Sequence, residues 1–162
     1  MKKLIVKTSQ LTLLLAITTL GFTSCDKDEV IPETTPVVVK TGAVFVSNEG
    51  GFLKNEAAVS FINLDNNEVI ADVYQSNNSE ILGDVAQSIT AINGKVYVVV
   101  NNSAKAVIIN PTTFKKEGEI TGLGSPNYMA AGDATHAYIS DLFGGPISVI
   151  NTTSNAVEKT ID

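Results

Sequence analysis

The sequence has no tryptophan and no arginine, and among its 162 residues it has one cysteine and one histidine. A single cysteine excludes an intrachain disulfide, so apolar burial has to hold the fold together. One His and one Cys give little support for a structural zinc or copper site, which takes several such ligands. We therefore expect no bound metal and no cofactor. The absence of tryptophan also argues against a glycan-binding surface built on stacked indole rings.

Positive charge is scarce as well. All 11 basic residues are lysines, against 17 acidic residues, and three of the lysines lie in the N-terminal segment 1–24. The chain that follows this segment has 8 lysines, 17 acidic residues and a net charge of −9. No basic patch is available to contact a phosphate backbone, so nucleic acid is not an expected partner.

The first 24 residues have the pattern of a secretory signal peptide. A basic start, Met1–Lys3, precedes an apolar run of 12 residues at Leu11–Phe22. That run is too short to cross a bilayer, which takes about 20 apolar residues. Two small residues then precede Cys25, an order that resembles a bacterial lipobox with Phe22 in place of the usual Leu. The resemblance implies cleavage after Ser24, diacylation of Cys25 and a lipid anchor in the membrane. A soluble periplasmic protein with a spare thiol is the alternative.

Residues 25–41 have the composition of a tether, with charges, two prolines and little patterning. The acidic stretch Asp26–Glu29 resembles the export signal that sends lipoproteins of Bacteroidetes to the outer face of the outer membrane. The plainer interpretation of this stretch is a solvated linker. We expect a lipid-anchored outer-membrane protein that is exposed at the cell surface.

The segment Gln87–Ile120 contains four short strand-like runs separated by polar, Gly or Pro turns. Between the first two runs, Asn93 and Gly94 supply the two positive-φ residues of a type I′ hairpin turn. Such a meander is typical of one antiparallel sheet. The expected strands are Ser88–Ile92, Lys95–Asn101, Ala106–Asn110 and Lys116–Ile120.

This pattern repeats along the chain. The strand that ends at Asn63 has a counterpart ending at Asn110, 47 positions later, and another ending at Asn151, 41 positions after that. Gly83 and Gly124 are also 41 positions apart. Four strands in about 40–45 residues is the pattern of a propeller blade. The sequence therefore predicts an all-β fold, a β-propeller of four-stranded antiparallel blades, over residues 42–162. The expected blades are 42–75, 84–122 and 126–162.

The first of these three units lacks a strand equivalent to Ser88–Ile92. Its third strand is expected at Glu68–Tyr74, and almost no helix is expected after the signal peptide, because no window has a 3.6-residue apolar period. Known propellers close with about four to eight blades. We therefore expect an incomplete propeller, the N-terminal piece of a longer protein with about seven blades.

Two stretches of the second unit resemble the YVTN-type propeller repeat, VYVVVNN at Val96–Asn102 and AVIINPTTFKKEGEI at Ala106–Ile120. The stretches FVSNEGG at Phe45–Gly51, LGDVAQS at Leu82–Ser88 and GLGSPNYM at Gly122–Met129 resemble a branch of Bacteroidetes surface lipoproteins. Some members of that branch capture vitamin B12, a corrinoid, and deliver it to a TonB-dependent outer-membrane transporter. The resemblance covers residues 42–162 and implies a similar capture role.

In propellers, the loops from the second to the third strand of each blade share one face with the connections between blades. That face is the expected ligand-binding rim. Amide and carboxyl side chains there can pair with the amide arms of a corrinoid, and aromatic rings can cover its apolar edge. The candidate ligand-binding residues are Asn48, Glu49, Phe52, Asp84, Gln87, Asn101, Asn102, Asn127, Tyr128, Asp141 and Phe143.

Local structure offers a second interpretation for some of these residues. Asn48, Asn101 and Asp141 recur at one position of the repeat, where an Asx side chain caps a strand end without any ligand. Three tyrosines are expected within strands and are assigned to packing: Tyr74, Tyr97 and Tyr138.

Three functions fit the sequence. Non-enzymatic ligand capture at the cell surface is favoured, because the chain shows no nucleophile–base pair and no paired carboxylates at matched repeat positions. Related propellers include quinone-cofactor dehydrogenases and lyases, so an enzyme of quinoprotein or lyase type is one alternative. A surface scaffold or adhesion protein is the other. We expect no catalytic residue in this chain.

Overall fold

The computed structural model describes residues 42–162, all of which belong to the second of two units of the chain, Pro32–Asp162. The expected signal peptide (1–24), the lipidated Cys25 and the acidic tether (25–41) lie outside the described residues. Among residues 42–162, no helix has the length and apolar character needed to cross a membrane.

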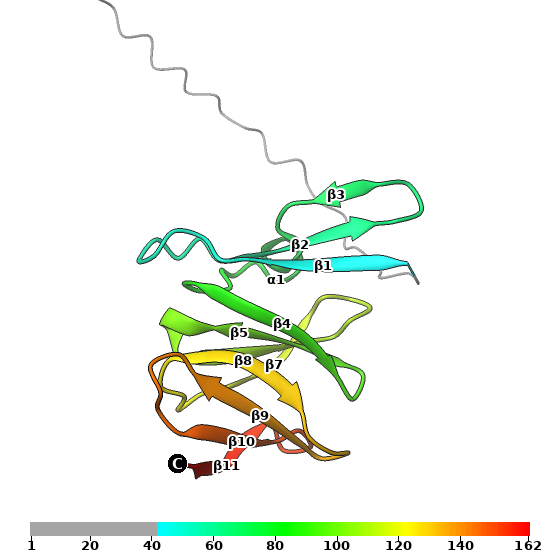
Figure 1. The fold of residues 1–162 in the computed structure, drawn as a ribbon. Coiled ribbons are helices and arrows are strands. Elements are labelled where there is room, and N and C mark those ends of the chain that lie inside the picture. The colour runs from blue at the N-terminus through cyan, green and yellow to red at the C-terminus, as the bar shows by residue number, and fades with distance from the viewer. Residues whose placement is uncertain (1–41) are drawn as a thin grey trace, which may run out of the picture. The chain divides into compact units, whose positions relative to one another are not determined.

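Three antiparallel sheets follow one another along the chain (Figure 1). In each sheet every strand pairs with its neighbour in the sequence, so each sheet is the predicted meander. The first sheet has three strands, β1 (Ala43–Asn48), β2 (Ala58–Asn63) and β3 (Glu68–Ile70). The middle sheet has four, β4 (Ala86–Ile92), β5 (Lys95–Val100), β6 (Lys105–Ile109) and β7 (Lys116–Ile120). The third sheet also has four, β8 (Pro126–Ala131), β9 (His136–Asp141), β10 (Ile147–Asn151) and β11 (Ala156–Ile161).

The hairpin between β4 and β5 has the predicted turn. Asn93 and Gly94 have φ angles of 50° and 76°, which are the two positive values that a type I′ turn requires. The turn sets the register, in which Ile92 faces Lys95 and Ile89 faces Val98.

The prediction of a strand over Glu68–Tyr74 is wrong at its C-terminal end. β3 stops at Ile70, and a short helix, α1 (Val73–Asn78), follows it. The Asp72 side chain caps this helix, because its Oδ1 accepts a hydrogen bond from the backbone N–H of Gln75 at 3.0 Å. Tyr74 consequently lies in a helix and not in a strand, although it packs in the core as expected. One three-residue 3₁₀ turn, η1 (Asn101–Ser103), is the other helical segment within 42–162.

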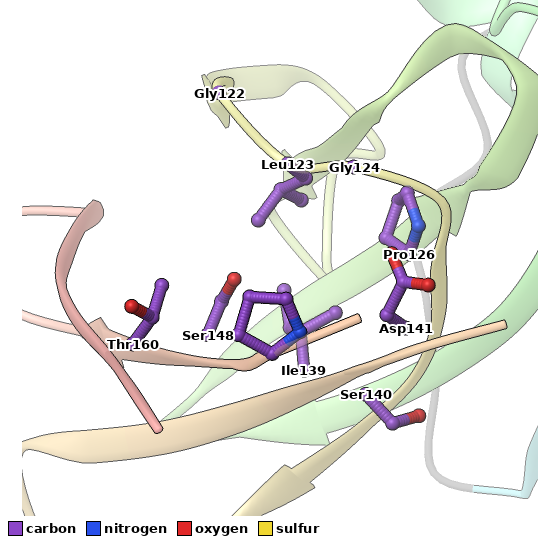
Figure 2. A pocket seen from close by; sticks show the side chains of 10 residues that line it. Gly122, Leu123, Gly124, Pro126, Ile139, Ser140, Asp141, Ser148 and Thr160 are labelled. Atoms are coloured by element: carbon purple, nitrogen blue, oxygen red, sulfur yellow. The ribbon is translucent and has the colours of Figure 1, made fainter. Parts of the chain in front are cut away.

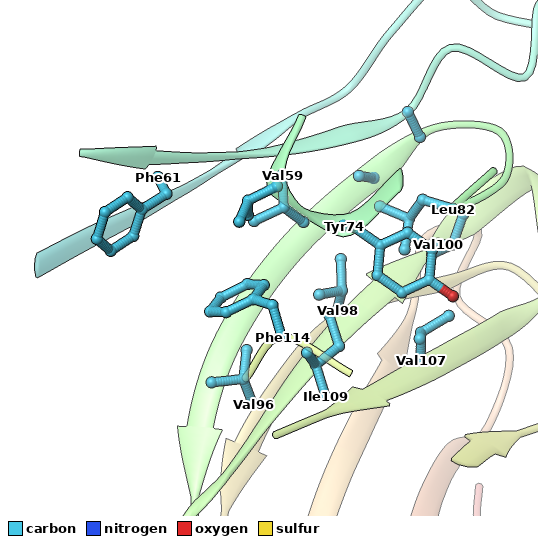
Figure 3. Close-up of a cluster of buried hydrophobic side chains, with 13 residues drawn as sticks. Val59, Phe61, Tyr74, Leu82, Val96, Val98, Val100, Val107, Ile109 and Phe114 are labelled. Atoms are coloured by element: carbon cyan, nitrogen blue, oxygen red, sulfur yellow. The ribbon is translucent and has the colours of Figure 1, made fainter. Parts of the chain in front are cut away.

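The middle sheet is covered on both faces, which explains the unbroken apolar run of β5. Successive side chains of a strand point to opposite faces. Val96, Val98 and Val100 therefore pack against the first sheet and α1 (Figure 3), whereas Tyr97 and Val99 pack against the third sheet. Each face contributes to a separate apolar cluster, so the three sheets are joined by two layers of packed side chains.

Phe114 closes the first of these layers. It lies in the turn between β6 and β7 with a φ of 54°, an unusual angle for a bulky residue, and its side chain is fully buried. Its ring stacks on Phe45 with 4.2 Å between the centroids. A residue of the middle sheet thereby fills space beneath β1.

Candidate ligand-binding rim

The loops at one end of the three sheets are tied together by backbone hydrogen bonds. Ala57 N–H donates to the carbonyl of Gly83, and Ala86 N–H donates to that of Glu49, which joins the β1–β2 loop to the connection between the first two sheets. Leu142 N–H donates to the carbonyl of Ser125 at 2.8 Å and joins the β9–β10 loop to the next connection. We call the resulting surface the loop rim; it consists of these loops and the adjoining strand ends, residues 48–57, 79–87, 101–104, 121–128 and 141–146.

Asp84 is the centre of the hydrogen bonding in the first half of the loop rim. Its Oδ2 accepts from the backbone N–H of Leu53 at 2.8 Å and from Nδ2 of Asn102 at 2.6 Å. Its own N–H donates to Oγ of Ser103 at 2.9 Å. Only 4 % of Asp84 is exposed, and its Oδ1 is buried with no hydrogen-bond partner among the described residues. Asp84 thus holds two loops together and retains one free acceptor.

The backbone on both sides of Asp84 is restricted. Gly83 has a φ of 136°, and a Cβ there would lie 2.6 Å from Oγ of Ser103, so the position requires glycine. Val85 has a φ of 64°, which is strained for a β-branched residue. Such strain persists only where the surrounding contacts enforce it, and here the Asp84 contacts do so.

Asp141 plays a comparable part in the second half of the loop rim. Its Oδ2 accepts from Ser125 N–H at 2.7 Å, and its Oδ1 accepts from Phe143 N–H at 2.9 Å and Gly145 N–H at 3.1 Å. These backbone bonds, that from Ser125 first, lower the pKa of Asp141 below its ordinary value of 3.8. The bonds match the strand-end cap that was the alternative interpretation of this residue.

Asn48, Asn101 and Asp141 do not occupy one position of the repeat, and that prediction is wrong for Asn101. When the strands are aligned on their closing residues Asn63, Asn110 and Asn151, Asn48 and Asp141 correspond to Val100. Asn101 is one residue further on because β5 runs into the 3₁₀ turn η1. Its Nδ2 donates to the carbonyl of Pro126 at 2.8 Å and links the middle sheet to the third, whereas Asn48 Nδ2 donates to Oγ of Ser60.

Gln87 and Tyr128 occupy equivalent positions, 41 residues apart, in the first strands of the middle and third sheets. Both lie where the strand register shifts, between Ala86 and Ser88 and between Pro126 and Met129. Such irregularities redirect side chains out of the regular alternation. Asn127, beside Tyr128, has a buried Oδ1 with no hydrogen-bond partner within 42–162.

Large apolar side chains are exposed on the loop rim. Phe143 is 82 % exposed, and Phe52 and Tyr128 are also mostly exposed. The opposite rim, formed by the turns at 64–67, 93–94, 110–115, 132–135 and 152–155, has Leu64 as its one exposed large apolar residue. A cluster of exposed large apolar side chains at one end of the sheets is typical of an interaction site. Sequence reasoning missed its remaining members, which are Leu53, Ile81 and Leu142.

A small pocket of about 110 Å³ opens between the connection after β7 and the third sheet (Figure 2). Drug-sized ligands occupy about 300–1,000 Å³, so this pocket admits a side arm and not a whole macrocycle. Of the predicted site residues, Asp141 lines it. The lining residues are Gly122, Leu123, Gly124, Pro126, Ile139, Ser140, Asp141, Pro146, Ser148 and Thr160.

The remaining predicted residues have simpler surroundings. Glu49 is exposed and takes part through its backbone carbonyl. Within 42–162, no group of three or more His, Cys, Asp and Glu side chains could hold a metal ion. His136 lies on the opposite rim, where Asp133, at 2.9 Å from its Nδ1, and then Glu158 raise its pKa.

The successive meanders and their face-to-face packing define a β-propeller architecture. The chain belongs to the family described as "Domain of unknown function (DUF5074)", whose family model matches residues 42–162. None of the curated proteins searched matches the sequence.

Two solved structures that are similar to the chain are propeller-like and confirm the predicted fold class. One is the crystal structure of a nidogen/laminin complex, with a TM-score of 0.56, 12% identity and coverage of 74% of this chain and 43% of that one. The other is the hydrazine synthase of Kuenenia stuttgartiensis, with a TM-score of 0.58, 16% identity and coverage of 74% and 32%. The chain spans less than half the length of either, and at this identity the likeness shows the fold alone.

Proposed function

We propose that the protein is a non-enzymatic ligand-binding lipoprotein of the bacterial cell surface. In this proposal Cys25 carries the lipid, and the loop rim captures a corrinoid or a similar polar macrocycle for a TonB-dependent transporter. The observation that carries the proposal is the exposure of Phe143, Phe52 and Tyr128 on the same amide-rich rim, while the opposite rim exposes a single large apolar residue, Leu64.

The chemistry of the loop rim suits a ligand that has amide arms around an apolar ring. Asn127 has a free buried acceptor, Oδ1, that an amide N–H of the ligand can satisfy. Gln87 and Tyr128 are redirected by the two register shifts, and Phe143 offers a ring face to an apolar edge. The pocket beside Asp141 has room for one arm. The rim therefore matches both halves of such a ligand.

Calorimetry with cobalamin tests the ligand. The protein should release or absorb heat on binding, and Gln87→Ala or Tyr128→Ala should weaken the affinity by about tenfold, the effect of one lost buried contact of about 1–3 kcal/mol. Matched controls on the opposite rim are Thr153→Ala for Gln87 and Leu64→Ala for Tyr128, and neither should change the affinity. A protein that gives no heat with cobalamin and no shift in melting temperature does not have this ligand.

Labelling with a fatty acid tests the anchor separately. The protein should incorporate the label when it is made in a bacterium with lipoprotein processing, and Cys25→Ala should abolish incorporation. Equal labelling of the variant would exclude lipidation at Cys25, whatever the calorimetry shows. Cell-surface exposure is tested by adding a protease to intact cells, which should degrade the labelled protein.

A protein partner is the second candidate, favoured by the apolar character of the loop rim. Phe52, Leu53, Leu142 and Phe143 are exposed on its two main loops, and aromatic side chains of this kind are enriched in protein–protein interfaces. If the protein is a scaffold or adhesion protein, titration with cobalamin should give no binding heat. Phe143→Ser would then reduce binding to the partner, with Leu64→Ser as the control.

A further inference from the structure

Two sheet faces of the protein are apolar and uncovered in the described part of the chain. On the third sheet, Tyr138, Ile147 and Ile161 are 38 %, 41 % and 45 % exposed. On the first sheet, Val44 and Val46 are each 40 % exposed. We call these surfaces the third-sheet outer face and the first-sheet outer face. Neither belongs to the loop rim.

The third-sheet outer face repeats a face that is buried elsewhere in the same chain. Forty-one residues earlier, Tyr138, Ile147 and Ile161 correspond to Tyr97, Ala106 and Ile120, in the register that the closing Asn110 and Asn151 define. Tyr97, Ala106 and Ile120 are at most 1 % exposed, because the third sheet covers them. The third-sheet outer face therefore has the residue pattern of a sheet face that a further sheet covers.

The first-sheet outer face repeats the complementary surface. Val44, Val46 and Ile62 correspond to Ala137, Ile139 and Ile150 when the strands are aligned on Asn63 and Asn151. Ala137, Ile139 and Ile150 are the residues with which the third sheet covers the middle sheet. They also correspond to Val96, Val98 and Ile109, with which the middle sheet covers the first. The first-sheet outer face therefore has the residues with which, inside the chain, one sheet covers the sheet before it.

We propose that two copies of this chain dock head to tail, with the third-sheet outer face of each copy packed on the first-sheet outer face of the other. A contact between two different faces closes into a ring when the rotation allows it. Two copies with three sheets each would give a ring of about six blades, within the range of about four to eight in which propellers close. A second copy is the proposed occupant because it presents both faces in the register in which the equivalent residues pack inside the chain.

The packing inside the chain indicates what the docked faces would contribute. Tyr97 is fully buried against the third sheet, and its partner position Tyr138 would be covered in the same way. An aromatic side chain stands at this position in all three sheets, since Phe45 is the equivalent residue of the first. Phe45 also packs towards the following sheet. The aromatic position is therefore a sheet-to-sheet contact in the two cases that the chain shows internally.

The solution mass of the whole chain tests the proposal. Sedimentation equilibrium should give twice the mass of a single chain, with dissociation on dilution. Tyr138→Asp and Val46→Asp place a charge in an apolar contact, so each should raise the dissociation constant about tenfold or more. Leu64→Asp is the matched control, because Leu64 is an exposed apolar residue outside both outer faces, and its dissociation constant should not change.

Mixing the two variants separates docking from misfolding. A pair made of one Tyr138→Asp chain and one Val46→Asp chain keeps one contact with both of its faces unaltered. The mixture should therefore associate more tightly than either variant alone, which misfolded chains cannot do. A monomeric wild-type protein, an open-ended polymer, or variants that stay dimeric would each overturn the proposal.

Discussion

The middle and third sheets are built from the same repeat, yet they differ in how their strands are buried. β5 is buried at every position after Lys95, whereas buried and more exposed residues alternate along the first part of β9. The middle sheet has a packed neighbour on both faces, and within residues 42–162 the third sheet has one on a single face. An unbroken apolar strand therefore marks a sheet covered on both sides, and alternation marks a sheet with one open face.

The largest effect is expected from one substitution made at equivalent positions of these two sheets. Ile120→Ala removes a fully buried side chain and should lower the free energy of unfolding by about 2–5 kcal/mol. Ile161→Ala, 41 residues later, should cost less than about 1 kcal/mol, since Ile161 is partly exposed. Urea unfolding at a protein concentration too low for two copies to pair measures both. Equal costs would contradict the difference in burial.

The second largest effect is expected from alanine substitution of the two glycines that precede the middle and third sheets. Gly83→Ala meets a side chain at 2.6 Å at a φ of 136° and should cost about 1–3 kcal/mol in the free energy of unfolding. Gly124→Ala meets Oδ2 of Asp141 at 2.8 Å, but Gly124 is not among the residues with a positive φ, so its cost should be smaller. Thermal unfolding compares the two variants. A larger loss for Gly124→Ala would show that Asp141 is held more rigidly than the backbone around Gly83.

The aspartates of the loop rim make a third comparison. Asp84→Ala removes two partly buried hydrogen bonds and should lower the free energy of unfolding by about 1–3 kcal/mol. Hydrogen exchange at the Leu53 amide should speed up at the same time, because that amide loses its acceptor. Asp84→Asn keeps an acceptor oxygen and serves as the control. Unchanged exchange at Leu53 in Asp84→Ala would mean that the β1–β2 loop is held by other contacts.

The smallest effect is expected from pH at the opposite rim. Lys95 in the middle sheet and His136 in the third occupy equivalent positions, and a histidine side chain changes its charge near neutral pH. Asp133 and Glu158 raise the pKa of His136 above 6.5, so its stabilising contribution is present below that value. It is lost as the pH rises through the raised pKa. Unfolding curves of the wild type and His136→Gln should therefore converge at high pH, with the histidine pKa read from NMR titration. Curves that stay parallel would exclude this contribution.

The repeat of strands along the sequence predicts the three sheets, but it does not predict local departures such as the helix α1. The strand pattern and the Asn93–Gly94 turn depend on neighbouring residues, which the sequence displays directly. The helix α1 also had a local signal, because Asp72 and Gln75 have the spacing of a capping box, but it is only six residues long. Its two apolar residues, Val73 and Tyr74, fit a strand equally well.

The candidate site was harder to predict, since its bonds join distant residues. The sequence indicates Asp84 as a ligand contact, yet its Oδ2 accepts a hydrogen bond from the amide of Leu53, which is 31 positions away. No sequence pattern reports such a bond. The one-residue offset of Asn101 arises from the 3₁₀ turn η1, which the repeat in the other two sheets lacks.

The stacked rings of Phe45 and Phe114 set the order in which this end of the protein can assemble. The two residues are 69 positions apart, so β1, although it is synthesised first, cannot complete the burial of its aromatic ring until the β6–β7 turn has formed. We therefore expect the middle sheet to form before the first sheet docks on it, the reverse of chain order. Phe45→Leu should accordingly speed unfolding and leave the folding rate nearly unchanged, which stopped-flow kinetics would reveal. During synthesis, which proceeds from the N-terminus, β1 would therefore stay exposed to other chains until the middle sheet has formed.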